Sequence, residues 1–230
     1  MVTKKMKART IRVFLCYSSE ENELAGEIKD NLEAHGLEVF LAHEDIEPTE
    51  EWQEVIIRKL KECDIFVPIV SKNFKNSRWT DQETGIAFAE EKMIIPISHD
   101  LVPYGFIGKF QALKLGEKIP ESCDKIIGII KTKNNKLKEM LTDCFVKSFV
   151  ESTSYAESNK KALLLISYEP FTEDQVNELI RGFMSNNQIH GAYEARRAIR
   201  GLFEKYFKDI NQELRNKFYE YEPLSRDPSS

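Results

Sequence analysis

Short apolar runs alternate with amphipathic stretches over the first 130 residues of the chain. Four of the runs are continuously apolar and rich in β-branched or aromatic residues, which is typical of buried strands. These runs span residues 11–17, 37–41, 64–70 and 93–98, and residues 111–115 form a candidate strand at the edge. The pattern therefore predicts five strands.

The stretches between these runs have helical spacing. Leu24, Ile28 and Leu32 recur every four residues, which places them on one face of a helix. Similar patterns predict helices over residues 52–63 and 79–91. Short apolar strands separated by helices indicate a parallel sheet that is covered on both faces, so we expect an α/β fold.

Two prolines refine the expected pairing of the strands. Pro68 and Pro96 fall inside the third and fourth predicted strands. Proline cannot donate a ladder hydrogen bond, so each is expected where the pairing of its strand lapses.

In open parallel sheets, ligands bind beyond the carboxyl ends of the strands. We therefore expect the loops after the first three strands to carry the chemistry.

The second part of the chain differs in composition. Residues 1–130 hold 17 basic and 23 acidic side chains, whereas residues 131–230 hold 16 and 15. The later part is also mostly helical in pattern. We therefore predict one domain over residues 10–130 and a helical region of unknown family over residues 131–225.

Capping and periodicity support the helical region. Thr172 and Gln175 have the spacing of a capping box. Two apolar stripes predict the core faces of a small bundle: Val176, Leu179, Ile180 and Phe183, then Ile199, Leu202, Phe203, Tyr206, Phe207 and Ile210. Three arginines are interpreted as a solvated helix face, with a basic patch as the alternative: Arg196, Arg197 and Arg200. Oligomerisation, recognition of a partner and restraint of the first domain are all open as roles.

Composition and charge exclude several function classes. The chain has 230 residues with 33 basic and 38 acidic side chains, a net charge of −5, so a strongly basic nucleic-acid binder is not expected. No run approaches the roughly 18 apolar residues of a membrane span, and the basic start lacks the apolar segment of a signal peptide. The four cysteines show no CxxC spacing and are interpreted as buried free thiols. These features predict a cytoplasmic protein.

Several familiar site types do not fit the predicted loops. The turn after the first strand, YSSE, has no glycine, which excludes a P-loop or a GxGxxG turn. A GxSxG nucleophile motif is also missing. The four histidines lack zinc-ligand spacing, so no metal site is expected. His43 and His99 fall in loops after strands, where they either line a pocket or are solvated.

Four segments in order resemble one known family. They are FLCYSSEE at the first strand, VFLAHEDIEPTEEW around the second loop, SRWTDQETGIAFA in the third helix and PYGFIGKFQAL after the fourth strand. Together they resemble the TIR domains of prokaryotes, over residues 10–130. The resemblance implies a flavodoxin-like fold, a five-stranded parallel sheet with helices on both faces, which agrees with the prediction from periodicity.

The resemblance also implies an enzymatic activity. Many TIR domains cleave NAD+ at the nicotinamide–ribose bond with one glutamate in a pattern like W-x-x-x-E, which Trp79 and Glu83 match. Trp52 matches the aromatic residue that follows the D-I-x-P segment of the prokaryotic branch, which here contains Asp45 and Ile46. NAD+ is then the substrate, and no cofactor is expected.

Further candidate substrate ligands lie in the same loops. The turn at Ser18 and Ser19 precedes a predicted helix and can bind a phosphate through backbone N–H groups. Tyr17 adjoins this turn, and His43 lies in the second loop. Either tryptophan can stack on a flat nicotinamide or adenine ring. Each candidate also has a structural alternative: a solvated carboxylate for the glutamate, packing for the aromatic residues and helix capping for the serines.

Two function classes stay open. The first is an NAD+ glycohydrolase or cyclase in prokaryotic antiviral defence or signalling, which releases nicotinamide and gives linear or cyclic ADP-ribose. The second is a non-catalytic module that assembles signalling complexes through its TIR surfaces. In related enzymes a neighbouring protomer completes the pocket, so we expect self-association to raise activity and an activating protein or ligand to control it.

Overall fold

The computed structural model describes residues 9–41 and 52–222. The chain divides into two compact units. The first comprises Met1–Glu33 with Leu37–Leu141, and the second comprises Ala34–Gly36 with Thr142–Ser230. No helix in the described ranges is long and apolar enough to cross a membrane.

The first unit is built on a parallel sheet with strand order β2-β1-β3-β5-β6, and β4 also pairs with β3. Its strands are β1 (Arg12–Cys16), β2 (Glu38–Leu41), β3 (Ile65–Val70), β4 (Met93–Ile94), β5 (Ile97–Ser98) and β6 (Leu113–Lys114). All five predicted strands are present, and the fourth is split into β4 and β5. The predicted α/β, flavodoxin-like fold is confirmed.

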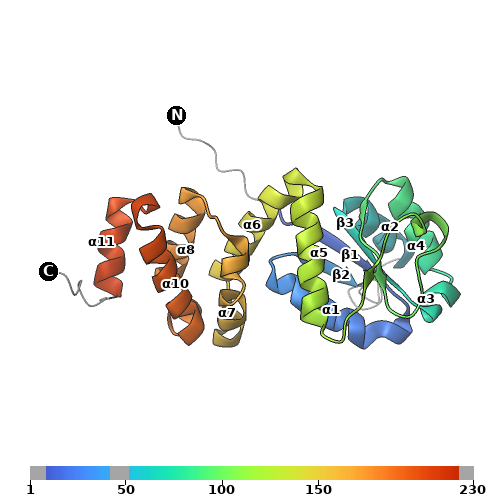
Figure 1. The fold of residues 1–230 in the computed structure, drawn as a ribbon, viewed down its shortest axis with the longest axis horizontal. Coiled ribbons are helices and arrows are strands. Elements are labelled where there is room, and N and C mark those ends of the chain that lie inside the picture. The colour runs from blue at the N-terminus through green and yellow to red at the C-terminus, as the bar shows by residue number, and fades with distance from the viewer. Residues whose placement is uncertain (1–8, 42–51, 223–230) are drawn as a thin grey trace. The chain divides into compact units, whose positions relative to one another are not determined.

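Helices cover both faces of this sheet (Figure 1). They are α1 (Asn22–Ala34) after a short turn η1 (Ser19–Glu21), α2 (Trp52–Glu62), α3 (Lys72–Asn76), α4 (Thr80–Ala89) after Trp79, and α5 (Ile119–Lys133). On one face, the Cys123 thiol of α5 lies 3.9 Å from the carbonyl oxygen of Ile28 in α1. On the other face, α2 packs against α4 and both contact β1.

Helix α3 is not predicted by the sequence pattern, and it has only five residues. A single turn is too short to show helical periodicity. The turn is instead defined by its cap, because the Ser71 hydroxyl accepts a hydrogen bond from the Phe74 N–H at 2.9 Å.

Strand alternation decides which side chains meet α2 and α4. Successive residues of a strand point to opposite faces, so Phe14 and Cys16 of β1 share one face. They join one buried cluster with residues from β2, β3 and the helices on that side: Phe40, Val55, Ile56, Leu60, Cys63, Phe66, Phe74 and Ala87. The last residue of the interior strand β1 therefore lies under α4.

The two prolines lie where pairing lapses, as predicted. Ile95 N–H donates to the Phe66 carbonyl at 3.0 Å, and the next bond of a parallel ladder would come from the N–H of residue 68. Pro68 has none, so the ladder stops and resumes where Ile69 pairs with Ile97. Pro96 lies between β4 and β5, but its carbonyl accepts the Leu113 N–H on the side of β6 at 2.8 Å, so the donor that is missing toward β3 is that of Pro68.

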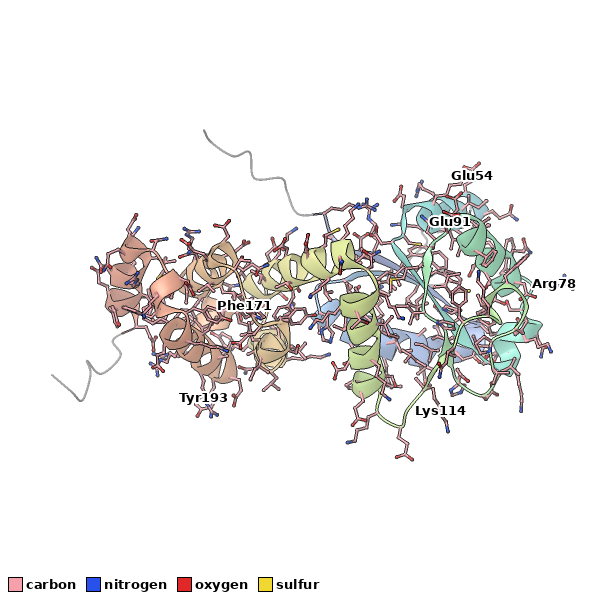
Figure 2. The ribbon with its side chains drawn as sticks, turned by 45° about the horizontal axis from the view of Figure 1, so that its top comes forward. Glu54, Arg78, Glu91, Lys114, Phe171 and Tyr193 are labelled. Carbon is pink, nitrogen blue, oxygen red and sulfur yellow. The ribbon has the colours of Figure 1, made fainter. Side chains whose placement is uncertain are left out.

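The second unit is helical. Its helices are the later part of α6 (Asn135–Val150), α7 (Tyr155–Ala162), α8 (Glu173–Ser185), α9 (Asn187–His190), α10 (Tyr193–Lys205) and α11 (Gln212–Tyr221), with short turns η3 (Leu165–Tyr168) and η4 (Phe207–Asp209). The capping box of Thr172 and Gln175 is present. Both predicted stripes are buried apart from Phe207, which is half-buried. Tyr193 projects outward from the start of α10 (Figure 2).

The predicted arginine face is exposed to solvent in part, since the side chains of Arg196 and Arg200 are 43% and 40% exposed, but both also bind a buried carboxylate. Arg196 donates to both carboxylate oxygens of Glu222, at 2.9 and 3.1 Å, and Arg200 also contacts this carboxylate. Glu222 is fully buried, so it needs these cationic partners. Arg197 is exposed, as the prediction had it.

We expect Glu222→Ala to destabilise the second unit, because it leaves two arginines without their shared carboxylate. The loss of unfolding free energy is expected to be about 2 kcal/mol, below the usual value for buried pairs because both arginines are partly exposed. Thermal unfolding followed by circular dichroism measures it. Lys217→Ala, which breaks the exposed pair with Glu213 on α11, is the control and is expected to cost less than about 0.5 kcal/mol. Equal losses in the two variants would contradict this account.

Candidate active site

The site centres on Glu83 in the first turn of α4. Trp79 precedes this helix, and its carbonyl accepts the Glu83 backbone N–H at 2.9 Å. The spacing of four residues places both side chains on one side of the helix, as predicted. Glu83 is buried, with only 2% of its surface exposed. The alternative in which it is a solvated carboxylate is therefore wrong.

A hydrogen bond to the backbone of α3 fixes the start of α4. The Thr80 hydroxyl donates to the carbonyl oxygen of Phe74 at 2.6 Å, and Thr80 is itself buried. Because Phe74 is fully buried in the apolar cluster, this bond ties the first turn of α4 to the core. The exposed Arg78 lies just before this turn and extends into solvent (Figure 2).

The carboxylate of Glu83 meets the end of β1. The thiol of Cys16, the last residue of β1, donates a hydrogen bond to Glu83 Oε2 at 2.9 Å. Cys16 is fully buried. The pair lies at the carboxyl end of β1, which is the edge of a parallel sheet where ligands bind.

Burial controls the protonation of both groups. Removal from water raises the pKa of Glu83 from 4.5 to about 7, although the hydrogen bond from Cys16 opposes this rise. Burial, followed by the charge of Glu83, also raises the pKa of the Cys16 thiol. At neutral pH the thiol is therefore a stable donor, while Glu83 populates both its ionised and its protonated form. A carboxyl group with a pKa near 7 is typical of functional sites.

Two aromatic rings meet at the start of α4. The rings of Trp52 and Trp79 are 4.2 Å apart and perpendicular, at 89°. Trp52 is the first residue of α2, so the contact joins the N-terminal ends of α2 and α4. Both tryptophans are half-buried, so they combine a packing contact with partial exposure. Their role in stacking on a substrate stays a prediction.

The loop after β1 supplies three predicted residues. Tyr17 is buried and its hydroxyl donates to Asn22 Oδ1 at 3.0 Å. Ser18 occupies the N-cap position of η1, but its side chain makes no capping bond. Ser19 begins η1 and is exposed. The prediction that these serine side chains cap the helix is therefore not met for Ser18, whose own carbonyl accepts the Glu21 N–H at 2.8 Å.

The remaining predicted residues lie elsewhere. His43, Asp45 and Ile46 fall outside the described residues. His99 is exposed, and its backbone N–H donates to the Val70 carbonyl at 3.0 Å. Among the residues that the structure describes, no group of three or more His, Cys, Asp or Glu is placed to hold a metal ion. All four cysteines are free and buried, which confirms the prediction.

Two residues of this edge were missed. Cys16 was interpreted as a buried thiol, yet it is the hydrogen-bond partner of Glu83. Glu21 is also buried, and its Oε1 accepts from the Ser71 hydroxyl and the Asn73 amide at 2.7 and 2.9 Å. The second oxygen, Oε2, is buried without a hydrogen-bond partner in the part of the chain that the structure describes. The available signal for Cys16 was its spacing of two residues from Phe14, because alternate residues of a strand point to the same face of the sheet.

The first unit is thus an open α/β domain with a buried carboxylate at the carboxyl edge of its parallel sheet. Residues 13–127, half of the chain, match the TIR domain family, and the chain belongs to that family. This confirms the resemblance that the sequence motifs indicated. Membership in the prokaryotic, NAD-cleaving branch stays a prediction.

Comparison with solved structures gives matches of low identity. The TIR domain of the Toll-related receptor TRR-2 from Hydra magnipapillata is 23% identical, with a TM-score of 0.41 over 56% of this chain and 96% of that one. The CMP N-glycosidase BcmB from Clostridium botulinum is also 23% identical, with a TM-score of 0.38 over 50% of this chain and 98% of that one. Among curated proteins, none matches the chain.

The raised pKa of Glu83 has a consequence for stability. Its folded-state pKa of about 7 exceeds the unfolded value of 4.5, so the fold favours the protonated form. This contribution is fully present below pH 4.5 and is lost as the pH rises through 7. Glu83→Gln mimics the protonated group, so its stability relative to wild type should increase from pH 5 to pH 8 by up to roughly 3 kcal/mol. Thermal unfolding at both pH values measures the change.

The matched control is Glu54→Gln on the exposed face of α2 (Figure 2). We expect its stability relative to wild type to be the same at the two pH values. A pH-independent effect of Glu83→Gln would show that the carboxylate is not desolvated as described.

Proposed function

We propose that this chain cleaves the nicotinamide–ribose bond of NAD+ and that Glu83 is its catalytic carboxylate. The observation that carries the proposal is the burial of this one carboxylate, with its pKa raised to about 7, at the carboxyl edge of the sheet. Membership in the TIR family supports the choice of reaction, since the W-x-x-x-E pattern of NAD-cleaving members is present at Trp79 and Glu83.

The chemistry needs only one carboxylate. Ordinary glycosidases use two, because an acid must protonate the poor alkoxide leaving group. The nicotinamide of NAD+ is a pyridinium cation, so the electron pair of the broken C1′–N bond leaves it neutral without a proton. The ribose then carries the positive charge of an oxocarbenium-like transition state. A negative Glu83 in a buried site stabilises that charge more strongly than it could in water.

The outcome depends on which nucleophile reaches C1′. Attack by water forms a new C1′–O bond and releases one proton, which gives linear ADP-ribose. Attack by a ring nitrogen of the adenine gives a cyclic product. Both are consistent with one carboxylate, since neither step requires a second acid.

The neighbouring tryptophans suit the substrate. Because the rings of Trp52 and Trp79 are perpendicular, a flat nicotinamide or adenine that stacks on one of them meets the edge of the other. Trp52 is the first residue of α2, and Trp79 directly precedes α4, the helix that carries Glu83. The contact between the two rings therefore lies at the start of that helix.

Loss of the carboxylate is expected to abolish turnover. If charge stabilisation contributes about 4 kcal/mol, Glu83→Gln lowers the rate of NAD+ consumption roughly a thousandfold. Purified full-length protein is incubated with NAD+, with and without a crowding agent to promote self-association, and products are separated by chromatography. The control is Glu90→Gln, an exposed carboxylate at the end of the same helix, which is expected to retain wild-type turnover.

The product peak separates the hydrolase from the cyclase. An absence of NAD+ consumption in every assembled state of the wild type would reject the enzymatic proposal. It would favour the non-catalytic interaction module instead.

The pH dependence follows from the need for an ionised Glu83. We expect kcat/KM to rise with pH through about 7 and then to level, because this parameter reports the free enzyme. Once NAD+ is bound, its positive pyridinium favours the ionised form of Glu83 and lowers the pKa of this group. The rise of kcat with pH should therefore occur at lower pH than the rise of kcat/KM. Initial rates from pH 5 to pH 9 measure both. Rates that fall with rising pH over this range would show that the protonated form is the active one.

A further inference from the structure

The thiol of Cys16 differs from that of Cys63 in its acceptor. Cys63 donates to the backbone carbonyl of Leu60 at 3.2 Å, a local bond within its own turn. Cys16 instead donates to the carboxylate of Glu83, which lies 67 positions further along the chain, at 2.9 Å. The bond is therefore a tertiary contact between β1 and α4.

The geometry leaves little freedom to either partner. Cys16 is fully buried and Glu83 is 2% exposed, so water does not compete strongly for the bond. The buried residues of the cluster around Cys16 are aromatic or aliphatic apart from Cys63, whose thiol bonds to the Leu60 carbonyl. A buried carboxylate needs a donor to remain ionised. The thiol supplies one at the end of the strand nearest to the helix.

We propose that Cys16 is a positioning residue of the Glu83 site, whose S–H donor fixes the orientation of the carboxylate and holds negative charge on it. This inference rests on the proposed function only for its effect on turnover. Its effect on the charge state of Glu83 holds whatever reaction the site performs.

The charge balance around the pair agrees with this role. Burial keeps the Cys16 thiol protonated by raising its pKa, and the charge of Glu83 adds to that rise. Asp81 on α4 contributes a further negative charge, while its carboxylate accepts the hydroxyl of Tyr104 at 2.8 Å. Tyr104 is held neutral because burial raises its pKa, and Lys75 of α3 lies over its ring at 5.7 Å. The thiol is thus a neutral hydrogen-bond donor, because the negative charges of Glu83 and Asp81 disfavour its ionisation.

The thiol has a second acceptor when Glu83 is protonated. The carbonyl oxygen of Thr80 lies 4.0 Å from Cys16 Sγ, within the range of a weak S–H···O contact. Protonation of the carboxylate can therefore be accompanied by a small rotation of the thiol hydrogen, with no backbone movement.

The test compares variants at one position with a matched buried thiol. Cys16→Ala removes the donor, and Cys16→Ser keeps a donor of similar size. Cys63→Ala is the control, since Cys63 belongs to the same apolar cluster but bonds elsewhere. The pKa of Glu83 is measured in each full-length variant by carbon-13 NMR of carboxyl-labelled glutamate, with the signal assigned by its loss in Glu83→Gln.

We expect Cys16→Ala to raise the pKa of Glu83 by about one unit, because the ionised form loses a donor. Cys16→Ser and Cys63→Ala should leave it within about 0.3 unit of wild type. In NAD+ turnover, a one-unit rise predicts a loss of about fivefold in kcat/KM at pH 7 for Cys16→Ala, with most of the rate regained at pH 9. A purely structural role for the thiol would lower the rate equally at both pH values.

The outcomes separate this inference from the proposed function. A shifted pKa in a protein that never consumes NAD+ would reject the proposed reaction and keep the role of Cys16. Turnover that depends on Glu83, with an unchanged pKa in Cys16→Ala or an equal shift in Cys63→Ala, would overturn the role of Cys16 alone.

Discussion

The carboxyl edge of the sheet is organised around the buried carboxylate of Glu83. Removing an ionised carboxylate from water costs several kcal/mol unless donors or charges replace its hydration. Here the replacement comes from the Cys16 thiol, and the position of Glu83 in the first turn of α4 also favours negative charge. The pKa of about 7 shows that this replacement is partial. The site therefore keeps Glu83 poised between two charge states, and the surrounding structure holds it there.

That balance depends on rigid neighbours. Thr80 ties the start of α4 to Phe74, and Phe74 belongs to the apolar cluster that also contains Cys16. The strand that ends at Cys16 is paired on both sides, with β2 and β3. Donor and acceptor are thus fixed to the same core through two independent routes. A side chain that packs poorly anywhere in this cluster would change the distance between thiol and carboxylate.

Much of the fold could be predicted because its signals are local. Continuous apolar runs gave the strands, four-residue spacing gave the long helices, and the prolines marked the split strand. The capping box before α8 was read from two residues alone. The features that escaped prediction depend on distant contacts. Arg196 and Arg200 look solvated in the sequence, because Glu222, their buried partner, lies 26 and 22 positions away. The five-residue α3 has no periodicity to detect.

The candidate site was only half accessible to the same reasoning. The W-x-x-x-E spacing identified Glu83 and Trp79, and strand alternation places Cys16 on the side of Phe14. Neither of these signals shows that α4 covers that face of the sheet, close enough for a hydrogen bond between Cys16 and Glu83. Likewise, nothing local in the sequence indicates that Glu21 is buried with Ser71 and Asn73 on one of its oxygens. Burial of a charge is a property of the assembled core.

The interruption at Pro68 also decides how the outer strands are held to β3. Because proline offers no N–H, Pro68 removes one donor from the side of β3 that faces the fourth strand, whichever register that strand adopts. The outer part of the sheet is therefore joined to β3 through two short paired segments instead of one continuous ladder. Ile65 and Phe66 pair with Met93 and Ile94, and Ile69 and Val70 pair with Ile97 and Ser98.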